Sequence, residues 1–210
     1  MNKRREQPKN AMLTIAAILF ENFETLDVFG PIEVLGRFPE KFKPEFYSVN
    51  GGVVLSTQKV PVVTKSFGQL DSRSYALLIP GGIGTRDLVN DRDYVGSLSK
   101  LARDAEYILT VCAGSVLFSK TGMLDGKRAT SNKRAFSWAL RESPKVNWVK
   151  KARWVKDGSI YTSSGVSAGI DLAFGFISDL LGHDVAMKES TIIEYDWKDD
   201  PGWDPFAEMY

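Results

Sequence analysis

The sequence predicts one α/β domain whose central sheet is mainly parallel. Short apolar runs alternate with helical patterns along all 210 residues, and this alternation is typical of a parallel sheet covered by helices on both faces. Residues 14–20 are almost entirely apolar, as a strand buried on both faces requires. The length suits a single domain of this class, so we expect one domain over residues 1–210.

The expected strands follow the apolar runs. We expect strands at residues 14–20, 45–49, 75–79 and 107–111. Gly51 and Gly52 indicate a turn, and residues 53–55 with 60–63 read as a small hairpin. Asp157 and Gly158 predict a second hairpin turn between two short strands.

Helical patterns occupy residues 25–38, 91–105, about 113–121, 167–181 and about 183–195. Pro31 lacks a backbone N–H, so we expect the first helix to kink at Gly30 and Pro31 or to restart there. Gly182 predicts a left-handed cap on the helix at 167–181. We expect residues 1–11 to form a flexible N-terminal tail and residues 197–210 a C-terminal tail.

Composition restricts the classes of function. The formal net charge is +1, so no overall field favours nucleic acid or an anionic membrane as a partner. A single cysteine excludes an intrachain disulfide, and no apolar run is long enough to span a bilayer. We therefore expect a cytoplasmic protein. Gly81, Gly82 and Gly84 lack the full dinucleotide-binding spacing, so we expect no cofactor and no metal, and we expect a small-molecule electrophile as the partner.

Cys112 is the principal candidate for chemistry. It lies between an apolar β-rich run and an apolar helix, and the small residues Ala113 and Gly114 follow it. Such a sharp turn from strand to helix projects the side chain at the carboxyl edge of the sheet, where ligands bind in open α/β folds. The helix N-terminus favours thiolate over thiol, so we expect a pKa for Cys112 below the usual value of about 8.5.

Two further segments are expected at the same edge. Pro80, Gly81 and Gly82 end a strand and can present backbone N–H groups which, with the Ala113 N–H, would stabilise developing negative charge. Asp27 follows the first strand in an apolar setting, where burial would raise its pKa and keep it protonated. By itself, Asp27 also fits a simple helix N-terminal charge.

Four phrases of the sequence resemble the ThiJ/PfpI superfamily: AILFENFETLDVFGPIEVL, ALLIPGGIGTRDL, ILTVCAGSVLFSKTGMLDGKRAT and YTSSGVSAGIDLAFGFISDLLG. The resemblance covers about residues 13–196 and is strongest for the subgroup similar to isonitrile hydratase. It implies a flavodoxin-like three-layer sandwich, a homodimer, Cys112 as nucleophile and Asp27 as its acidic partner. It further implies that the N–H groups of Gly82 and Ala113 stabilise negative charge. The residues we assign to the pocket are Gly81, Ile83, Asn132 and Ser164.

The sequence departs from the family pattern at two positions. Asn132 stands where many members have a histidine, and Ala113 stands where hydratases of this type tend to have threonine. The only histidine, His183, is expected to be an exposed residue at the start of the last helix.

Three functions from different classes follow. The first is a hydratase that adds water to a small electrophile through Cys112 and Asp27. The second is a glyoxalase or deglycase acting on 2-oxoaldehydes, which the missing histidine disfavours. The third is a cysteine oxidation sensor or protective protein without catalysis. A transcription regulator is disfavoured, because residues 183–210 are too few for a helix-turn-helix domain with its own core.

Overall fold

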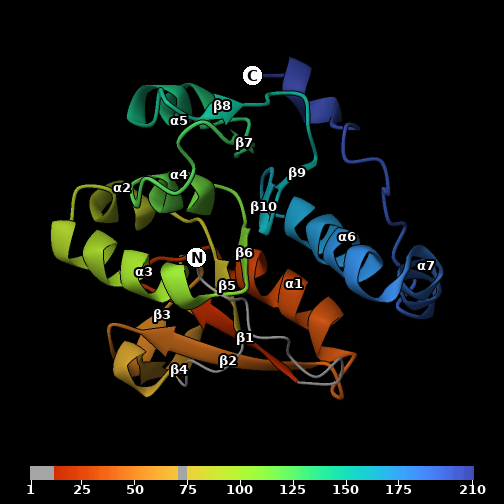
Figure 1. Ribbon diagram of the computed structural model, residues 1–210, viewed down its shortest axis with the longest axis horizontal. Helices are drawn as coiled ribbons and strands as arrows, with labels where there is room; N and C mark the ends of the chain where they lie inside the picture. The colour runs from red at the N-terminus through yellow and green to blue at the C-terminus, as the bar shows by residue number, and fades with distance from the viewer. Residues whose placement is uncertain (1–11, 71–74) are drawn as a thin grey trace, which may run out of the picture.

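An eight-stranded sheet forms the middle layer of the protein (Figure 1). The computed structural model describes residues 12–70 and 75–210. The strands of this sheet are β1 (Leu13–Ile18), β2 (Phe42–Ser48), β3 (Asn50–Leu55), β4 (Pro61–Ser66), β5 (Tyr75–Ile79), β6 (Tyr107–Thr110), β9 (Trp154–Asp157) and β10 (Ile160–Ser163). Their order is β3-β4-β2-β1-β5-β6-β10-β9, and only the outermost strands, β3 and β9, pair antiparallel.

Helices cover both faces of the sheet. They are α1 (Thr25–Gly36), α2 (Thr85–Leu88), α3 (Arg92–Asp104), α4 (Gly114–Ser119), α5 (Phe136–Glu142), α6 (Ala168–Leu181) and α7 (His183–Ile192). In Figure 1, α1 and α6 lie on one side of the sheet with α7 beyond them, and α3 and α4 lie on the other side. This arrangement confirms the predicted three-layer flavodoxin-like sandwich.

The core lies on the two faces of the central strands. In β1 every residue except Thr14 is buried, and all five residues of β5 are buried. Strands in the middle of a parallel sheet contact a helix layer on each face, which is why their sequences are apolar without alternation. The carboxyl ends of β1, β5 and β6 therefore lie side by side, and the segments that follow them meet at one edge.

Three local expectations need correction. Of the two alternatives expected at Pro31, the restart is wrong, because α1 is continuous through this residue. Gly51 and Gly52 lie inside β3 at φ of +75° and +89°, so the turn before this strand falls two residues before Gly51, at Val49. Gly182 has φ +107° and ψ +149°, which is not the left-handed helical conformation, because it also serves as the extended N-cap of α7.

The hydrophobic pattern of the sequence did not predict the shortest strands or the packing of the C-terminal segment. The strands β7 (Arg128–Ala129) and β8 (Asn147–Trp148) form a separate two-stranded parallel sheet beside α5. Residues 197–210 pack on the domain through the buried side chains of Trp197, Asp204 and Ala207 and end in a 3-10 turn, η2 (Pro205–Glu208). The expected tail at residues 1–11 lies outside the described residues.

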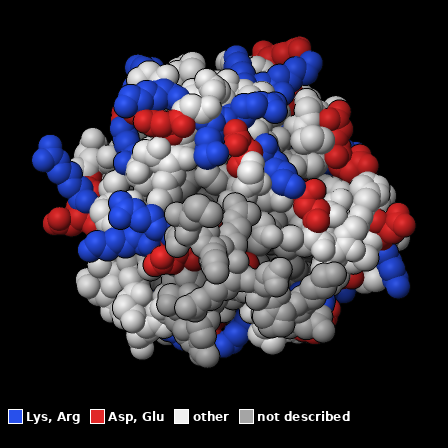
Figure 2. All heavy atoms as spheres, in the orientation of Figure 1, with Lys and Arg blue, Asp and Glu red and all other residues white. Residues whose placement is uncertain are grey.

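Charged side chains of both signs are interspersed on the face shown in Figure 2. No helix in the described part of the chain is sufficiently long and apolar to cross a membrane.

The glycine at the start of α4 gives a stability test. A Cβ on Gly114 would lie 2.2 Å from the carbonyl oxygen of Ile79, whereas a Cβ on Gly96 in the interior of α3 would meet nothing within 4 Å. We expect Gly114→Ala to lower the free energy of unfolding by about 1–3 kcal/mol or more. The control Gly96→Ala should raise it by about 0.5–1 kcal/mol, because alanine favours the helix. Urea unfolding of both variants checks this, and an unchanged midpoint for Gly114→Ala would contradict the close packing.

Candidate functional site

Cys112 occupies a strained elbow between β6 and α4. Its φ of +58° lies in the left-handed region, which is unusual for a residue other than glycine. Three hydrogen bonds of 3.0 Å hold its backbone: its N–H donates to the Ser164 carbonyl, and the hydroxyls of Ser115 and Ser131 both donate to its carbonyl. This framework fixes the strained conformation, as is common where strain has a functional role.

Gly81 brings the end of β5 against the elbow. A Cβ on Gly81 would lie 2.6 Å from the Ala113 nitrogen and 2.9 Å from the Cys112 Cβ, so no side chain fits there. The Gly81 N–H donates to Asp27 Oδ2 at 2.8 Å, and its carbonyl accepts from the Glu24 N–H at 2.9 Å. The two bonds join the start of α1 to the loop after β5 and place Asp27 beside Cys112.

Asp27 is a fully buried carboxyl group in hydrogen-bonding contact with the Cys112 thiol. Burial raises its pKa from 3.8 to about 8; the Gly81 N–H and the thiol oppose this rise, and the nearby charge of Glu24 adds to it. Within the described residues, Oδ1 has no hydrogen-bond partner with normal geometry. Asp27 is therefore mainly protonated at neutral pH, as its apolar sequence setting predicted.

The thiol itself is buried, with Cys112 only 8% exposed. Burial raises the pKa of Cys112 above its usual value, and the charge on Asp27 raises it further. Hydrogen bonds from the N–H groups of Ala113 and Val166 and from the Asn132 side chain act in the opposite direction. The prediction of a lowered thiol pKa is wrong, because desolvation outweighs these donors and the short helix α4.

The other predicted residues divide into two groups. Asn132 contacts the thiol, and Ser164 supports the elbow through its carbonyl. Gly82, at φ +119°, packs against residues 22–24. Ile83 is 62% exposed and is not among the residues that line the pocket next to Asn132.

Val166 is the contact that the sequence reasoning missed. Its backbone N–H faces the sulfur, and its φ of +39° is unusual for a β-branched residue. Any residue type supplies a backbone N–H, so only the position of Val166 after a strand end could have indicated this role.

A pocket of about 300 Å³ opens beside the two donors Asn132 and Val166. Its lining is Asn132, Lys133, Arg134, Ser164, Gly165, Val166, Ser167, Phe206 and Tyr210. The two aromatic residues come from the C-terminal segment, which sequence reasoning could not place. Among the residues that the structure describes, no group of three or more His, Cys, Asp or Glu side chains could hold a metal ion.

Comparison with known proteins identifies the family. Residues 13–179 match the sequence pattern of the DJ-1/PfpI family. The chain belongs to the DJ-1/PfpI family. This confirms the ThiJ/PfpI resemblance seen in the sequence, over most of the range assigned to it.

Relatives within the DJ-1/PfpI family differ in their described roles. The chain is 31% identical to isonitrile hydratase from Pseudomonas putida over 185 residues, which cover 87% of this chain and 78% of the hydratase. It is 29% identical to the HTH-type transcriptional regulator CdhR from Pseudomonas aeruginosa over 82% of this chain, and it spans about half of that regulator, 52%. The crystal structure of a ThiJ/PfpI family protein from Pseudomonas syringae superposes with a TM-score of 0.75 at 25% identity, covering 91% of this chain and 78% of that one.

Burial of the thiol predicts slow alkylation. We expect the rate of Cys112 alkylation by iodoacetamide to rise with pH through an inflection above the usual thiol value of about 8.5. Asp27→Asn should lower this inflection by about one pH unit or more, because it removes the neighbouring negative charge. Mass spectrometry of the single cysteine follows the reaction. An inflection below 8 in the folded wild-type protein would restore the original expectation of an activated thiolate.

Burial of Asp27 also makes stability depend on pH. Its pKa is about 8 in the folded protein against 3.8 as the ordinary value, so the folded state keeps a proton that the unfolded state loses. The stability from this group is fully present below about pH 4 and is lost as the pH rises through 8, at up to about 1.4 kcal/mol per pH unit.

Asp27→Asn should remove that dependence. We expect the free energy of unfolding of the variant, relative to the wild type, to increase steadily between pH 5 and about 8. Denaturant unfolding at several pH values measures it. A constant difference across this range would show that Asp27 is ionised in the folded protein.

Proposed function

We propose that the protein hydrates an isonitrile or a similar small electrophile, with Cys112 as nucleophile and Asp27 as proton carrier. The observation that carries this proposal is the contact between the only cysteine and a buried carboxyl group whose pKa is raised to about 8. Similarity to isonitrile hydratase over most of both chains supports the substrate class.

The first step joins the sulfur to the terminal carbon of the isonitrile. The Cys112 sulfur attacks this carbon, Asp27 gives its proton to the same carbon, and Asp27 takes the proton of the thiol. A covalent thioimidate results, and the carboxyl group is left as it began. Because neither group has to be ionised beforehand, the raised pKa values of both are compatible with this step.

The second step is hydrolysis of the thioimidate. Water adds to its carbon, and Asp27 takes a proton from the water while it protonates the nitrogen. The tetrahedral adduct then expels the sulfur, which recovers the hydroxyl proton, and an N-substituted formamide leaves. The N–H groups of Ala113 and Val166 would stabilise negative charge on the sulfur during attack and departure. The Gly82 N–H, as the family resemblance implies, would serve the same purpose.

This route needs no histidine, which fits the position of His183. Its side chain is exposed at the start of α7, where Nε2 lies 3.2 Å from Asp199 Oδ2 and the ring packs against Trp197. Reactions of 2-oxoaldehydes that move a proton between adjacent carbons would need another base. The homodimer implied by the resemblance stays a prediction.

Kinetics of three variants test the proposal. With an isonitrile as substrate, Cys112→Ser should abolish formamide production, and Asp27→Asn should lower kcat/KM by about 10²–10⁴-fold, because the amide cannot carry the proton. His183→Ala is the matched control and should change kcat/KM by less than about twofold. Circular dichroism verifies folding. A large loss in His183→Ala with full activity in Asp27→Asn would overturn this mechanism.

A further inference from the structure

We propose that the pocket beside Cys112 selects electrophiles that carry a carboxylate, and that Arg134 binds this carboxylate. The inference rests on the proposed function for the reaction itself, and it adds the class of substrate. It stands on the charges that line the pocket and on the way the pocket wall is held.

The lining of the pocket carries two cations and no carboxylate side chain. Lys133 is buried, and its ammonium is occupied by Asp204 at 3.3 Å, Thr130 Oγ1 at 2.8 Å and the Ala152 carbonyl at 2.9 Å. Arg134 is exposed, and its guanidinium has no ion pair or hydrogen bond among the described residues. The charge available to a ligand therefore belongs to Arg134, and a guanidinium binds a carboxylate through two parallel hydrogen bonds.

Arg134 is close in the chain to a residue that contacts the thiol, so a carboxylate bound to Arg134 would belong to a ligand that also approaches Cys112. Asn132 hydrogen-bonds the thiol, and Arg134 lines the same pocket two residues later. A small molecule with its electrophilic carbon at the sulfur and a carboxylate a few bonds away would reach both groups. The carboxyl group nearest the thiol, Asp27, is mainly protonated at neutral pH and would not repel such a ligand strongly.

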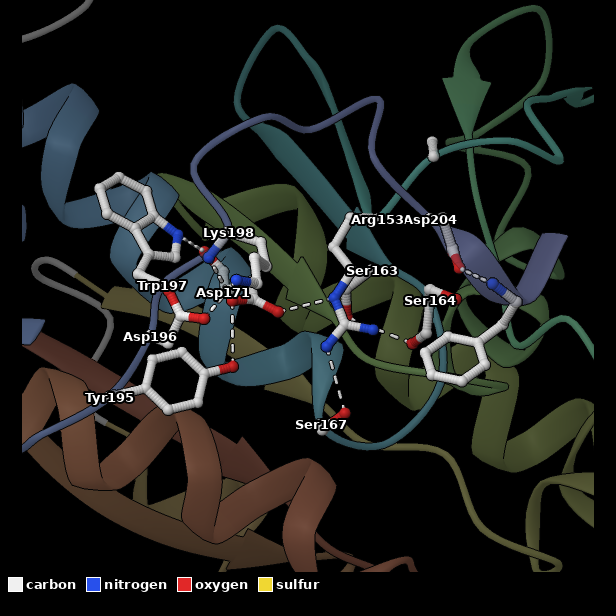
Figure 3. Close-up of polar contacts among 12 residues, drawn as sticks. Arg153, Ser163, Ser164, Ser167, Asp171, Tyr195, Asp196, Trp197, Lys198 and Asp204 are labelled. Atoms are coloured by element: carbon white, nitrogen blue, oxygen red, sulfur yellow. Dashed lines mark hydrogen bonds and ion pairs between the residues drawn. The ribbon is translucent and has the colours of Figure 1, made fainter.

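Two buried ion pairs hold other parts of the pocket wall. Lys133 and Asp204 fix the segment that carries Phe206 and Tyr210, and Asp204 Oδ1 also accepts the Phe206 N–H at 3.0 Å. Figure 3 shows the second anchor, where the Arg153 guanidinium reaches Asp171 on one side and Ser167 on the other. The aromatic side chains are thus positioned to cover the apolar part of a ligand whose charged end lies at Arg134.

A pair of alkylating reagents tests the preference without relying on hydratase activity. Iodoacetate and iodoacetamide have nearly the same shape and differ in charge, and with either one the sulfur forms a bond to carbon while iodide leaves. Cys112 is the only cysteine, so each rate reports this site alone. We expect the ratio of the iodoacetate rate to the iodoacetamide rate to fall about tenfold in Arg134→Gln, with the iodoacetamide rate changed by less than about twofold.

Arg141→Gln is the matched control, because Arg141 is an exposed arginine of α5 outside the pocket lining. It should leave the ratio unchanged. Raising the salt concentration from about 0.05 M to about 0.5 M should lower the wild-type ratio and leave that of Arg134→Gln nearly constant. An equal ratio in wild type and Arg134→Gln would overturn the proposal, and so would a folded protein in which neither reagent reaches Cys112.

Hydration kinetics separate this inference from the proposed function. We expect kcat/KM for isocyanoacetate to exceed that for its methyl ester by about tenfold in the wild type and to match it in Arg134→Gln. A charge preference in alkylation without turnover of either isonitrile would refute the hydratase and leave the carboxylate site standing. Turnover of both isonitriles at equal kcat/KM in the wild type would support the hydratase and refute the carboxylate site.

Discussion

The close backbone approach between the end of β5 and the Cys112 elbow is the constraint on which the site depends. Added Cβ atoms would lie 2.6 Å from the Ala113 nitrogen at Gly81 and 2.2 Å from the Ile79 carbonyl oxygen at Gly114, so both positions require glycine. Because the two backbones meet, the Gly81 N–H can hold Asp27 while Gly81 itself touches Cys112. The Asp27 carboxyl group and the Cys112 thiol are therefore brought together by the backbone of a third residue, Gly81.

Burial determines the protonation state of Asp27 and Cys112 before substrate binds. Charge on either group would have to exist in a desolvated environment, and the pKa values of both Asp27 and Cys112 are raised accordingly. The N–H groups around the sulfur do not overcome this in the ground state. They can still stabilise charge that develops transiently, which is the condition under which preorganised donors accelerate a reaction most. A neutral acid beside a neutral thiol is therefore compatible with a catalytic site.

Sequence reasoning correctly predicted that three candidate residues near strand ends lie together. Cys112, Asp27 and Gly81 each follow an apolar run, and parallel strands bring such positions to one edge of the sheet. It could not find Val166, which acts through its backbone N–H. It also misjudged the thiol pKa, because a helix start is visible in the sequence and the depth of burial is not.

The C-terminal segment was unpredictable for a different reason, since its place depends on contacts between residues far apart in the chain. Asp204 meets Lys133, the Pro201 carbonyl accepts the Arg153 N–H at 2.7 Å, and Asp171 accepts from Lys198 at 3.3 Å.

Two of these contacts involve buried charges, which lose hydration and contribute little net stability, although removal of one partner is costly. The role of this segment is better explained by the residues to which it is connected. The Arg153 carbonyl accepts the Ser164 N–H at 2.8 Å, and the Ser164 carbonyl accepts the Cys112 N–H at 3.0 Å. The segment that builds the pocket wall is thus joined through three successive backbone hydrogen bonds to the strained residue that carries the thiol. A displacement of this segment would therefore be transmitted through these hydrogen bonds to the backbone of Cys112.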